Sequence, residues 1–540
     1  MMRDEIQTIL RCNYDPQRWL QLLRVILPGT DVFASPQVVQ TSMSEAAQAL
    51  QLARVRLGDR KQLAVLQVRV SDRIDLLRNR VGLRNLVTRY IDQAEYHGVL
   101  AVFLSPQHDF RFTFAARMSE FDDDGNLIRR ETAPRRYTYV LGPNEACRTA
   151  AERFLQLSEK GLGATMQDVI EAFSVEKLNK EFFADFSRAF DRVKSEIEKR
   201  NKWKEKTAKE EAQTLLNRLL FLYFVQRKGW LNRQRDYLFR NFKPFADDAA
   251  TKTTFIDNFL RPLFTKLSTE GSQADISGHD LPFLNGGLFA DEYGDEHHDE
   301  IVRRHHELRI SNEVFRSVFD DLLERYNFTI QEDSPTNYEV AIDPEMLGQI
   351  FEELILTSEE SETEGKSKRH DTGSHYTRRP IVHYLCRDSL AALLESQPPF
   401  AGKKDAGERV RKLLALDVTE GIDDDTRKAL KQILSPEEAA LLLDRLFELR
   451  ACDPAVGSGA FPMGLLHELV NLARLCANRA SGRDPVLGDR SWLYTTKKRI
   501  IERVIYGVDI QPQAVDICKL RLWLSLMVDY ELSADPDNCE

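Results

Sequence analysis

Hydrophobic residues in the first part of the chain fall into short runs separated by turns and charged positions. Four runs rich in β-branched and aromatic residues cover residues 63–70, 98–105, 110–115 and 136–141, and each is bounded by Gly, Pro or charged residues. Runs of this length and composition are typical of β-strands. Residues 1–157 are therefore predicted to form a mixed α/β domain built on a sheet.

The pattern changes to a helical period in the middle of the chain. Apolar residues there recur at the spacing of a helix, at Leu215, Leu216, Leu219, Leu222 and Phe224. Gly229 follows two basic residues and is a typical helix stop. Residues 158–340 are predicted to be a helical domain. A third region, 341–540, opens where Asp343 caps a helix and Pro344 occupies its first turn.

Composition narrows the class of protein. The chain has 540 residues, of which 42% are hydrophobic and 30% charged, values typical of a soluble protein with several domains. Its longest apolar run, residues 215–225, contains Asn217 and Arg218 and falls short of the roughly 20 residues that span a bilayer. The first residues lead into no apolar signal segment, so we expect a cytoplasmic protein.

Cysteine usage and charge exclude further classes. The seven cysteines are never spaced as Cys-x-x-Cys, which argues against a disulfide framework or a cysteine-rich zinc site. The formal net charge of -10 argues against a uniformly basic coat for nucleic acid. A polyanion meets local patches rather than the net charge.

The strongest chemical signal is the segment 451–461, Ala-Cys-Asp-Pro-Ala-Val-Gly-Ser-Gly-Ala-Phe, followed by an amphipathic helical pattern. Gly457 and Gly459 let the backbone approach a ligand closely, and Asp453 places a carboxylate where the preceding strand ends. Pro462 follows where a dinucleotide fingerprint needs its third glycine, and the chain has no Gly-Lys-Ser/Thr triplet. The pattern predicts a crevice for a cofactor with a cationic amine rather than for a pyrophosphate.

These residues resemble adenine-specific DNA methyltransferases that use S-adenosylmethionine, in particular the long type IIG restriction–modification enzymes. The cofactor motif of that family reads Asp-Pro-Ala-x-Gly-Ser-Gly-x-Phe, and its fixed positions match Asp453, Pro454, Ala455, Gly457, Ser458, Gly459 and Phe461. The next family motif is found as Tyr-Gly-Val-Asp-Ile at 506–510, where the resemblance implies that Asp509 accepts hydrogen bonds from the ribose. A Gly-rich turn alone is more often an ordinary loop, and an aspartate in this place can also cap a helix.

A third similar segment lies upstream. Residues 373–377, Gly-Ser-His-Tyr-Thr, resemble the family's Gly-x-Phe/His-Tyr-Thr-Pro segment, which implies that Tyr376 and Thr377 lie against the methionine part of the cofactor. Arg378 stands where the family has proline, and Pro380 follows two residues later. Residues 343–350 resemble the helix that precedes this segment.

The resemblance implies an overall architecture. The expected fold is α/β, with an N-terminal mixed sheet domain, a helical middle region and, over 341–540, the start of a Rossmann-like methyltransferase domain. The implied function is transfer of a methyl group from S-adenosylmethionine to adenine in double-stranded DNA, within a restriction–modification or phage-defence system. The resemblance implies no metal.

The catalytic motif of the family, Asn/Asp/Ser-Pro-Pro-Tyr/Phe/Trp, is not found. The chain's Pro-Pro dipeptide lies in Gln397-Pro-Pro-Phe400, before the cofactor strand, and is interpreted as a linker. No residue is therefore assigned a catalytic role, and the chain is expected to hold only the beginning of the catalytic domain, as a truncated enzyme or as half of a split one. A second polypeptide that completes the domain is an expected partner. The alternative is a catalytically silent DNA-binding or scaffolding subunit.

The N-terminal domain suggests a fused endonuclease as a second alternative. Metal-dependent nucleases hold Mg²⁺ with an aspartate and a strand-borne Glu-x-Lys. Here Asp59 precedes the strand 63–70, but Gln67 and Arg69 stand at the other two positions, so an inactive or unrelated domain is favoured.

The sequence allows two interpretations for each of two charged stretches. An arginine run could contact DNA phosphates or form a solvated helix face: Arg69, Arg73, Arg78, Arg80, Arg84 and Arg89. Four histidines could hold a metal, although an acidic solvated helix explains the composition better: His297, His298, His305 and His306.

Overall fold

The computed structural model describes residues 2–39, 46–70, 96–104, 109–116, 120–121, 127–129, 135–246, 253–268, 281–282, 284, 289, 304, 307–330, 337–350, 377, 379–418, 421–489 and 491–530. The chain forms two compact units, the first made mostly of residues 1–343 and the second mostly of residues 344–540. Within the described ranges, no helix is long and apolar enough to cross a membrane.

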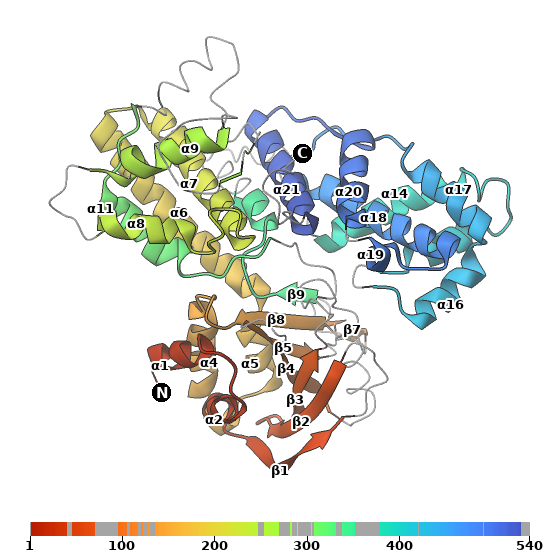
Figure 1. The fold of residues 1–540 in the computed structure, drawn as a ribbon, viewed down its shortest axis with the longest axis horizontal. Helices are drawn as coiled ribbons and strands as arrows, with labels where there is room; N and C mark the ends of the chain where they lie inside the picture. Colours follow the sequence, from red (N-terminus) through yellow and green to blue (C-terminus); the bar gives the residue numbers. More distant parts are fainter. Residues whose placement is uncertain are drawn as a thin grey trace. The chain divides into compact units, whose positions relative to one another are not determined.

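The first unit is built on a seven-stranded sheet, which we call the N-terminal sheet (Figure 1). Its order across the described residues is β1 (Thr30–Val38), β2 (Ala46–Arg56), β3 (Gln62–Val70), β4 (Gly98–Leu104), β5 (Phe110–Ala116), β8 (Arg135–Leu141) and β9 (Asn337–Glu339). β3 with β4 and β8 with β9 are parallel, whereas the other neighbours are antiparallel. The predicted N-terminal mixed sheet is thus confirmed. β6 (Glu120–Phe121) and β7 (Leu127–Arg129) pair separately.

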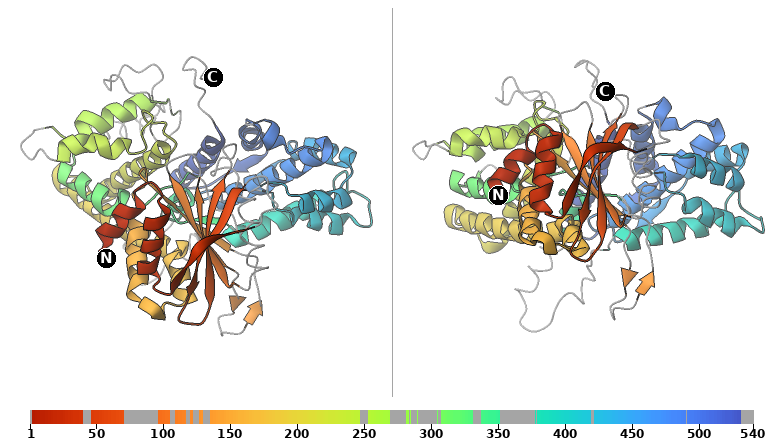
Figure 2. Two further views of the ribbon diagram at one scale, coloured as in Figure 1. Left: turned by 60° about the horizontal axis from the view of Figure 1, so that its bottom comes forward. Right: turned by 90° about the horizontal axis from the view of Figure 1, so that it is seen from below.

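Helices cover one face of this sheet (Figures 1 and 2): α1 (Arg3–Leu10), α2 (Pro16–Ile26), α4 (Arg148–Glu159) and α5 (Met166–Ala172). The ring of Phe112 on β5 lies 4.7 Å from Trp19, 5.8 Å from Phe154 and 5.4 Å from Phe173. Ala64, Leu66, Val68 and Ala101 are buried together on the other side of the strands. Both faces are therefore apolar and buried, as the near-continuous hydrophobic runs of the sequence require.

The rest of the first unit is helical, as predicted. It contains η1 (Gly161–Gly163), α6 (Val175–Asn201), α7 (Glu205–Arg227), α8 (Tyr237–Ala246), α9 (Arg261–Ser268), α11 (Asn312–Val318) and two π-helical turns, η2 (Ile256–Leu260) and η3 (Phe319–Leu323). Aromatic rings fill its core; Phe242 stacks on Phe319 at 4.7 Å and Phe255 on Phe259 at 5.2 Å.

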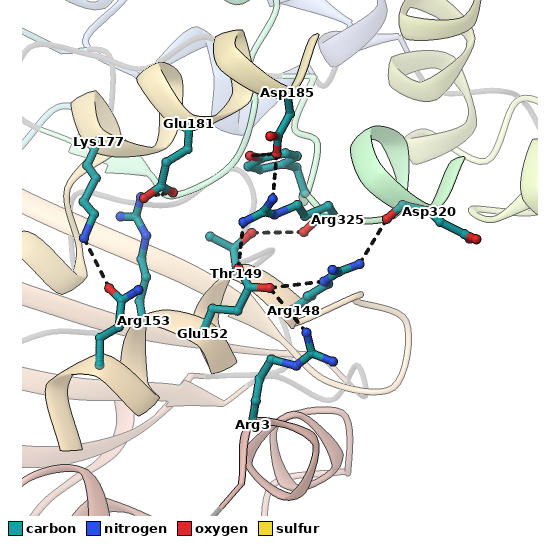
Figure 3. Close-up of polar contacts among 12 residues, drawn as sticks. Arg3, Arg148, Thr149, Glu152, Arg153, Lys177, Glu181, Asp185, Asp320 and Arg325 are labelled. Carbon is teal, nitrogen blue, oxygen red and sulfur yellow. Dashed lines mark hydrogen bonds and ion pairs between the residues drawn. The ribbon is translucent and has the colours of Figure 1, made fainter. Parts of the chain in front are cut away.

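A polar network joins these helices to α4, one of the helices that cover the N-terminal sheet (Figure 3). The carboxylate of Glu152 on α4 accepts hydrogen bonds from Arg148 at 3.2 Å and Arg325 at 3.3 Å. Arg325 also donates at 2.8 Å to the buried Asp185 on α6, which accepts a second bond from Tyr326 at 2.6 Å. Residues on both sides of the predicted boundary at 157 consequently belong to one unit.

The second unit has a two-stranded parallel sheet, the C-terminal sheet, formed by β10 (Ala451–Asp453) and β11 (Ile505–Gly507). Its helices are α14 (Arg379–Glu395), α15 (Ala406–Leu414), α16 (Asp424–Ile433), α17 (Pro436–Leu446), α18 (Ala460–Ser481), α19 (Pro485–Gly488), α20 (Trp492–Arg503) and α21 (Pro512–Asp529). α18 is the central helix, because its buried face packs in one core with residues of α14 to α17 and α20. The Pro398-Pro399 dipeptide lies in the turn between α14 and α15 and does not follow a strand in the sequence.

Candidate cofactor site

The two strands of the C-terminal sheet bring Asp453 and Asp509 together. Asp453 is the last residue of β10 and pairs with Gly507 on β11, so both aspartates lie at the carboxyl ends of parallel neighbours. The amide of Val508 donates to the carbonyl of Asp453 at 2.9 Å. Ligands of open α/β sheets bind at this edge. The sequence separates these aspartates by more than fifty positions, and the parallel pairing removes that separation.

The turn between β10 and α18 depends on its glycines. Gly457 and Gly459 have φ angles of 50° and 88°, in the left-handed region that residues with a Cβ rarely adopt. A Cβ added at Gly459 would lie 2.6 Å from Sγ of Cys518 on α21. The amide of Gly457 donates to Oδ2 of Asp509 at 2.8 Å. This hydrogen bond fixes the turn to the end of β11.

The carboxylate of Asp453 has one oxygen without a hydrogen bond. Its Oδ1 accepts from the amide of Ala455 at 3.1 Å, whereas Oδ2 is buried and no described residue donates to it. A buried carboxylate oxygen is costly to leave unpaired, so it marks a place where a donor is expected. Asp509 differs, since its two oxygens accept from Gly457 and from the amide of Gln511, the latter at 2.9 Å.

The remaining residues of the motif shape the surroundings. Pro454 and Ala455 are exposed, and Phe461 is half-buried in the first turn of α18. Because α18 begins at Ala460, its first amide groups lie directly behind the glycine turn, where a helix N-terminus favours negative groups. The structure thus brings six predicted site residues together with Asp509: Asp453, Pro454, Ala455, Gly457, Gly459 and Phe461.

Thr377 lies two residues before α14, and that helix packs against the start of α18. Sγ of Cys386 lies 3.8 Å from the carbonyl of Phe461, and burial, together with the nearby carboxylates Glu468 and Asp453, raises the pKa of this thiol to about 12. Tyr376 lies outside the described residues.

A buried carboxylate ties α14 to α18. Glu468 on α18 lies with Oε1 2.8 Å from Nδ1 of His383 and 2.9 Å from Nε of Arg387. Burial opposes ionisation of Glu468, but the His383 hydrogen bond and the Arg387 charge hold its pKa below the usual value. Burial, with a smaller contribution from His383, lowers the pKa of the neighbouring His467 to about 4. Because the pKa of Glu468 is lowered, its ion pair with Arg387 is retained at neutral pH.

Sequence reasoning did not assign a role to two residues that contact the turn at Ser458, namely Gly348 and Arg521. Ser458 is 1% exposed, and its carbonyl accepts a hydrogen bond of 2.9 Å from Nη1 of Arg521, itself 2% exposed. Arg521 stands in the apolar run Leu520–Leu524, and a lone charge in such a run was the available signal.

The nuclease-like positions of the N-terminal sheet have other partners. Oδ2 of Asp59 accepts a hydrogen bond of 3.2 Å from the amide of Met166 at the start of α5. Gln67 accepts one of 3.0 Å from the hydroxyl of Tyr14, and Arg69 is exposed. In the described part of the chain, no group of three or more His, Cys, Asp or Glu side chains could hold a metal ion. The four histidines in question, and the rest of the arginine run after Arg69, lie outside the described residues.

Comparisons with known proteins point in the direction that the motifs indicate. No family model matches the chain. Over 331 residues it is 29% identical to a protein of Methanocaldococcus jannaschii named "Putative type II restriction enzyme and methyltransferase"; the match covers 60% of this chain and 25% of that protein. The chain therefore spans about a quarter of the length of this relative.

A solved structure gives a weaker likeness. It is the "Type IIL restriction-modification enzyme MmeI in complex with DNA", with a TM-score of 0.35 and 16% identity over 63% of this chain and 36% of that one. A score this low carries no argument. The sequence match thus relates the chain to a restriction enzyme and methyltransferase, while adenine, the cofactor and the site residues stay predictions.

Proposed function

We propose that the turn between β10 and α18 binds S-adenosylmethionine, and that the chain contributes this site to an adenine-specific DNA methyltransferase of a restriction–modification system. The observation that carries the proposal is the buried, unpaired Oδ2 of Asp453 beside a turn whose two glycines have positive φ angles. The methionine part of the cofactor has a cationic amine, which supplies the missing donor and the opposite charge.

The other residues have separate tasks in this proposal. Asp509, already oriented by the amides of Gly457 and Gln511, accepts hydrogen bonds from the ribose hydroxyls. Gly457 and Gly459 give the turn its positive φ angles, and Gly459 also lets Cys518 of α21 pack against the turn. Tyr376 and Thr377 flank the methionine part. When bound, the cofactor supplies the methyl group, and the acceptor is the exocyclic amine of an adenine flipped out of the DNA duplex.

An uncovered face of the C-terminal sheet supports a further part of the proposal. Tyr506, Val508 and Ile510 alternate along β11 and its extension and are 46%, 58% and 93% exposed. Cys452, opposite Tyr506 on β10, is exposed as well. Because parallel sheets are ordinarily covered on both faces, another polypeptide segment packs here. It belongs to the same protein or to a second polypeptide, and it supplies the pocket for the target base.

Calorimetric titration of the chain with S-adenosylmethionine tests the function. The unmodified chain should bind, and Asp453→Ala should weaken binding by about 10- to 100-fold, the range for hydrogen bonds to charged groups. Asp444→Ala, at an exposed position of α17, is the matched control and should bind normally. Absence of binding by the unmodified, folded chain would contradict the proposal and favour a catalytically silent scaffolding subunit.

A further inference from the structure

The glycine turn is contacted by a helical segment, residues 345–350, that lies far away in the sequence. Residues 345–350 are helical, and a Cβ built on Gly348 would lie 2.6 Å from Oγ and 3.0 Å from Cβ of Ser458. Ser458 lies between the two glycines of the turn and is fully buried. The absence of a side chain at Gly348 therefore permits residues 345–350 to pack directly against the turn.

A buried arginine holds the same serine. Nη1 of Arg521 on α21 donates to the carbonyl of Ser458 at 2.9 Å, and it would lie 3.2 Å from a Cβ at Gly348. The three residues thus meet at one point, although they come from the helix 345–350, the turn and α21. A guanidinium removed from water keeps its position only when its hydrogen bonds are made well, so this contact fixes the backbone of the turn.

Residues 345–350 also contact the start of α14. Glu345 forms an ion pair with Arg379, and the side chains are 9% and 20% exposed. Arg379 is the first residue of α14 and follows Thr377 by two positions. The helical residues 345–350 consequently contact both segments to which sequence reasoning assigned the cofactor.

We propose that residues 345–350, together with Arg521, are the positioning element of the cofactor site. They hold the glycine turn and the Thr377 end of α14 in one fixed geometry before the ligand arrives. The inference rests on the proposed function for the identity of the ligand. Its physical basis is preorganisation, since a site whose segments are already fixed loses less conformational entropy on binding. None of these residues needs to contact the cofactor.

Gly348→Ala tests the positioning element most directly, because the added Cβ must displace Ser458, Arg521 or residues 345–350 themselves. We expect its affinity for S-adenosylmethionine to fall by about 10-fold, the scale of a lost contact network. Adding Ser458→Gly removes both atoms nearest to the new Cβ, so the double variant should bind more tightly than Gly348→Ala alone. Gly163→Ala is the control, since a Cβ there meets nothing within 4 Å.

Hydrogen exchange of the ligand-free chain separates positioning from local damage. In Gly348→Ala, amides 456–461 of the turn and amides 379–387 of α14 should both exchange faster than in the unmodified chain, and the Ser458→Gly addition should slow them again. Faster exchange in residues 345–350 alone, with unchanged affinity, would overturn the proposal. Should Gly348→Ala fail to fold, Glu345→Gln removes the charge from the ion pair with little change of shape, and it should speed exchange in 379–387.

The two proposals fail in different ways. If the unmodified chain does not bind S-adenosylmethionine, the proposed function is wrong, while the exchange data still decide whether the turn and α14 are held together. If the unmodified chain binds and Gly348→Ala binds equally well with wild-type exchange, the function stands and the positioning element is wrong.

Discussion

The two sheets of this protein differ in their strands and in what they contribute to the protein. The N-terminal sheet has seven strands among the described residues and buries apolar side chains on both faces. The C-terminal sheet has two short strands, and one of its faces exposes Tyr506, Val508 and Ile510. Burial stabilises the first sheet by about 25 cal/mol for each Å² of apolar surface removed from water. The second sheet places polar groups at its carboxyl edge and depends on the helices packed beside it.

Polar side chains differ between the sheets in the same way. On the N-terminal sheet, the hydroxyl of Thr113 pairs with that of Thr138 at 2.9 Å, and Gln67 accepts a hydrogen bond from Tyr14, which precedes α2. At the C-terminal sheet, Oδ2 of Asp453 is buried without a donor among the described residues. A buried carboxylate oxygen without a donor, at the edge of a parallel sheet where ligands bind, is a place where a ligand donor fits.

The largest effect is expected from Phe154→Ala, because this ring packs on Phe112 and Tyr139 in the core over the N-terminal sheet. The substitution should destabilise the first unit by about 3–5 kcal/mol. Denaturant unfolding measures the loss, with Leu162→Ala, at a position 73% exposed, as the control. If both variants unfolded at the same denaturant concentration, the N-terminal sheet would not be the scaffold that the comparison requires.

A smaller effect should come from the two ends of α18. Gly459 and Gly482 both have positive φ, at 88° and 75°, but only a Cβ at Gly459 meets another atom within 4 Å. Gly482→Ala should cost about 1 kcal/mol from backbone strain, and Gly459→Ala about 2–4 kcal/mol because the clash with Cys518 is added. Urea unfolding gives both values, and calorimetry should show lost cofactor binding for Gly459→Ala alone. Equal costs would mean that the turn has room to move.

The smallest effect concerns the helix caps, in which the two units should agree. Hydrogen bonds from Thr165, aided by Lys160, lower the pKa of Asp168 on α5 to about 2. The folded state therefore gains stability while Asp168 is ionised, and loses it as the pH falls from about 4 to about 2. Asp168→Asn should cost about 1 kcal/mol at neutral pH and flatten this part of the stability profile.

Glu438 on α17 tests the agreement from the second unit. Its burial opposes ionisation, yet hydrogen bonds from Lys403, Ser435 and Arg409 lower its pKa to about 2. Glu438→Gln should flatten the profile over the same acidic range in thermal unfolding at stepped pH. If only one of the two substitutions, Asp168→Asn or Glu438→Gln, flattened the dependence of stability on pH, the helix caps would also differ between the units.

Whether a structural feature could be predicted from the sequence depended on how close together in the chain its residues lie. Four strands of the N-terminal sheet, β3, β4, β5 and β8, were predicted because a buried strand needs a run of neighbouring apolar residues, whereas β1, β2 and β9 were not predicted. The turn at 454–459 was found because its glycines and Asp453 are close in sequence. Gly348 and Arg521 were missed, since each contacts Ser458 across a long separation, and even the lone charge of Arg521 in an apolar run does not indicate which residue it contacts.

The sequence by itself determined the α/β character, the helical middle and the chemistry of the candidate turn, because periodicity and residue type are local properties. Only the tertiary structure decided that Asp59 accepts a hydrogen bond from the first amide of α5 and that one oxygen of Asp453 is buried and unpaired. It also decided that Glu345 links residues 345–350 to α14. Burial and pairing are properties of a side chain's neighbours, and those neighbours are chosen by the folding of segments that lie far apart in the chain.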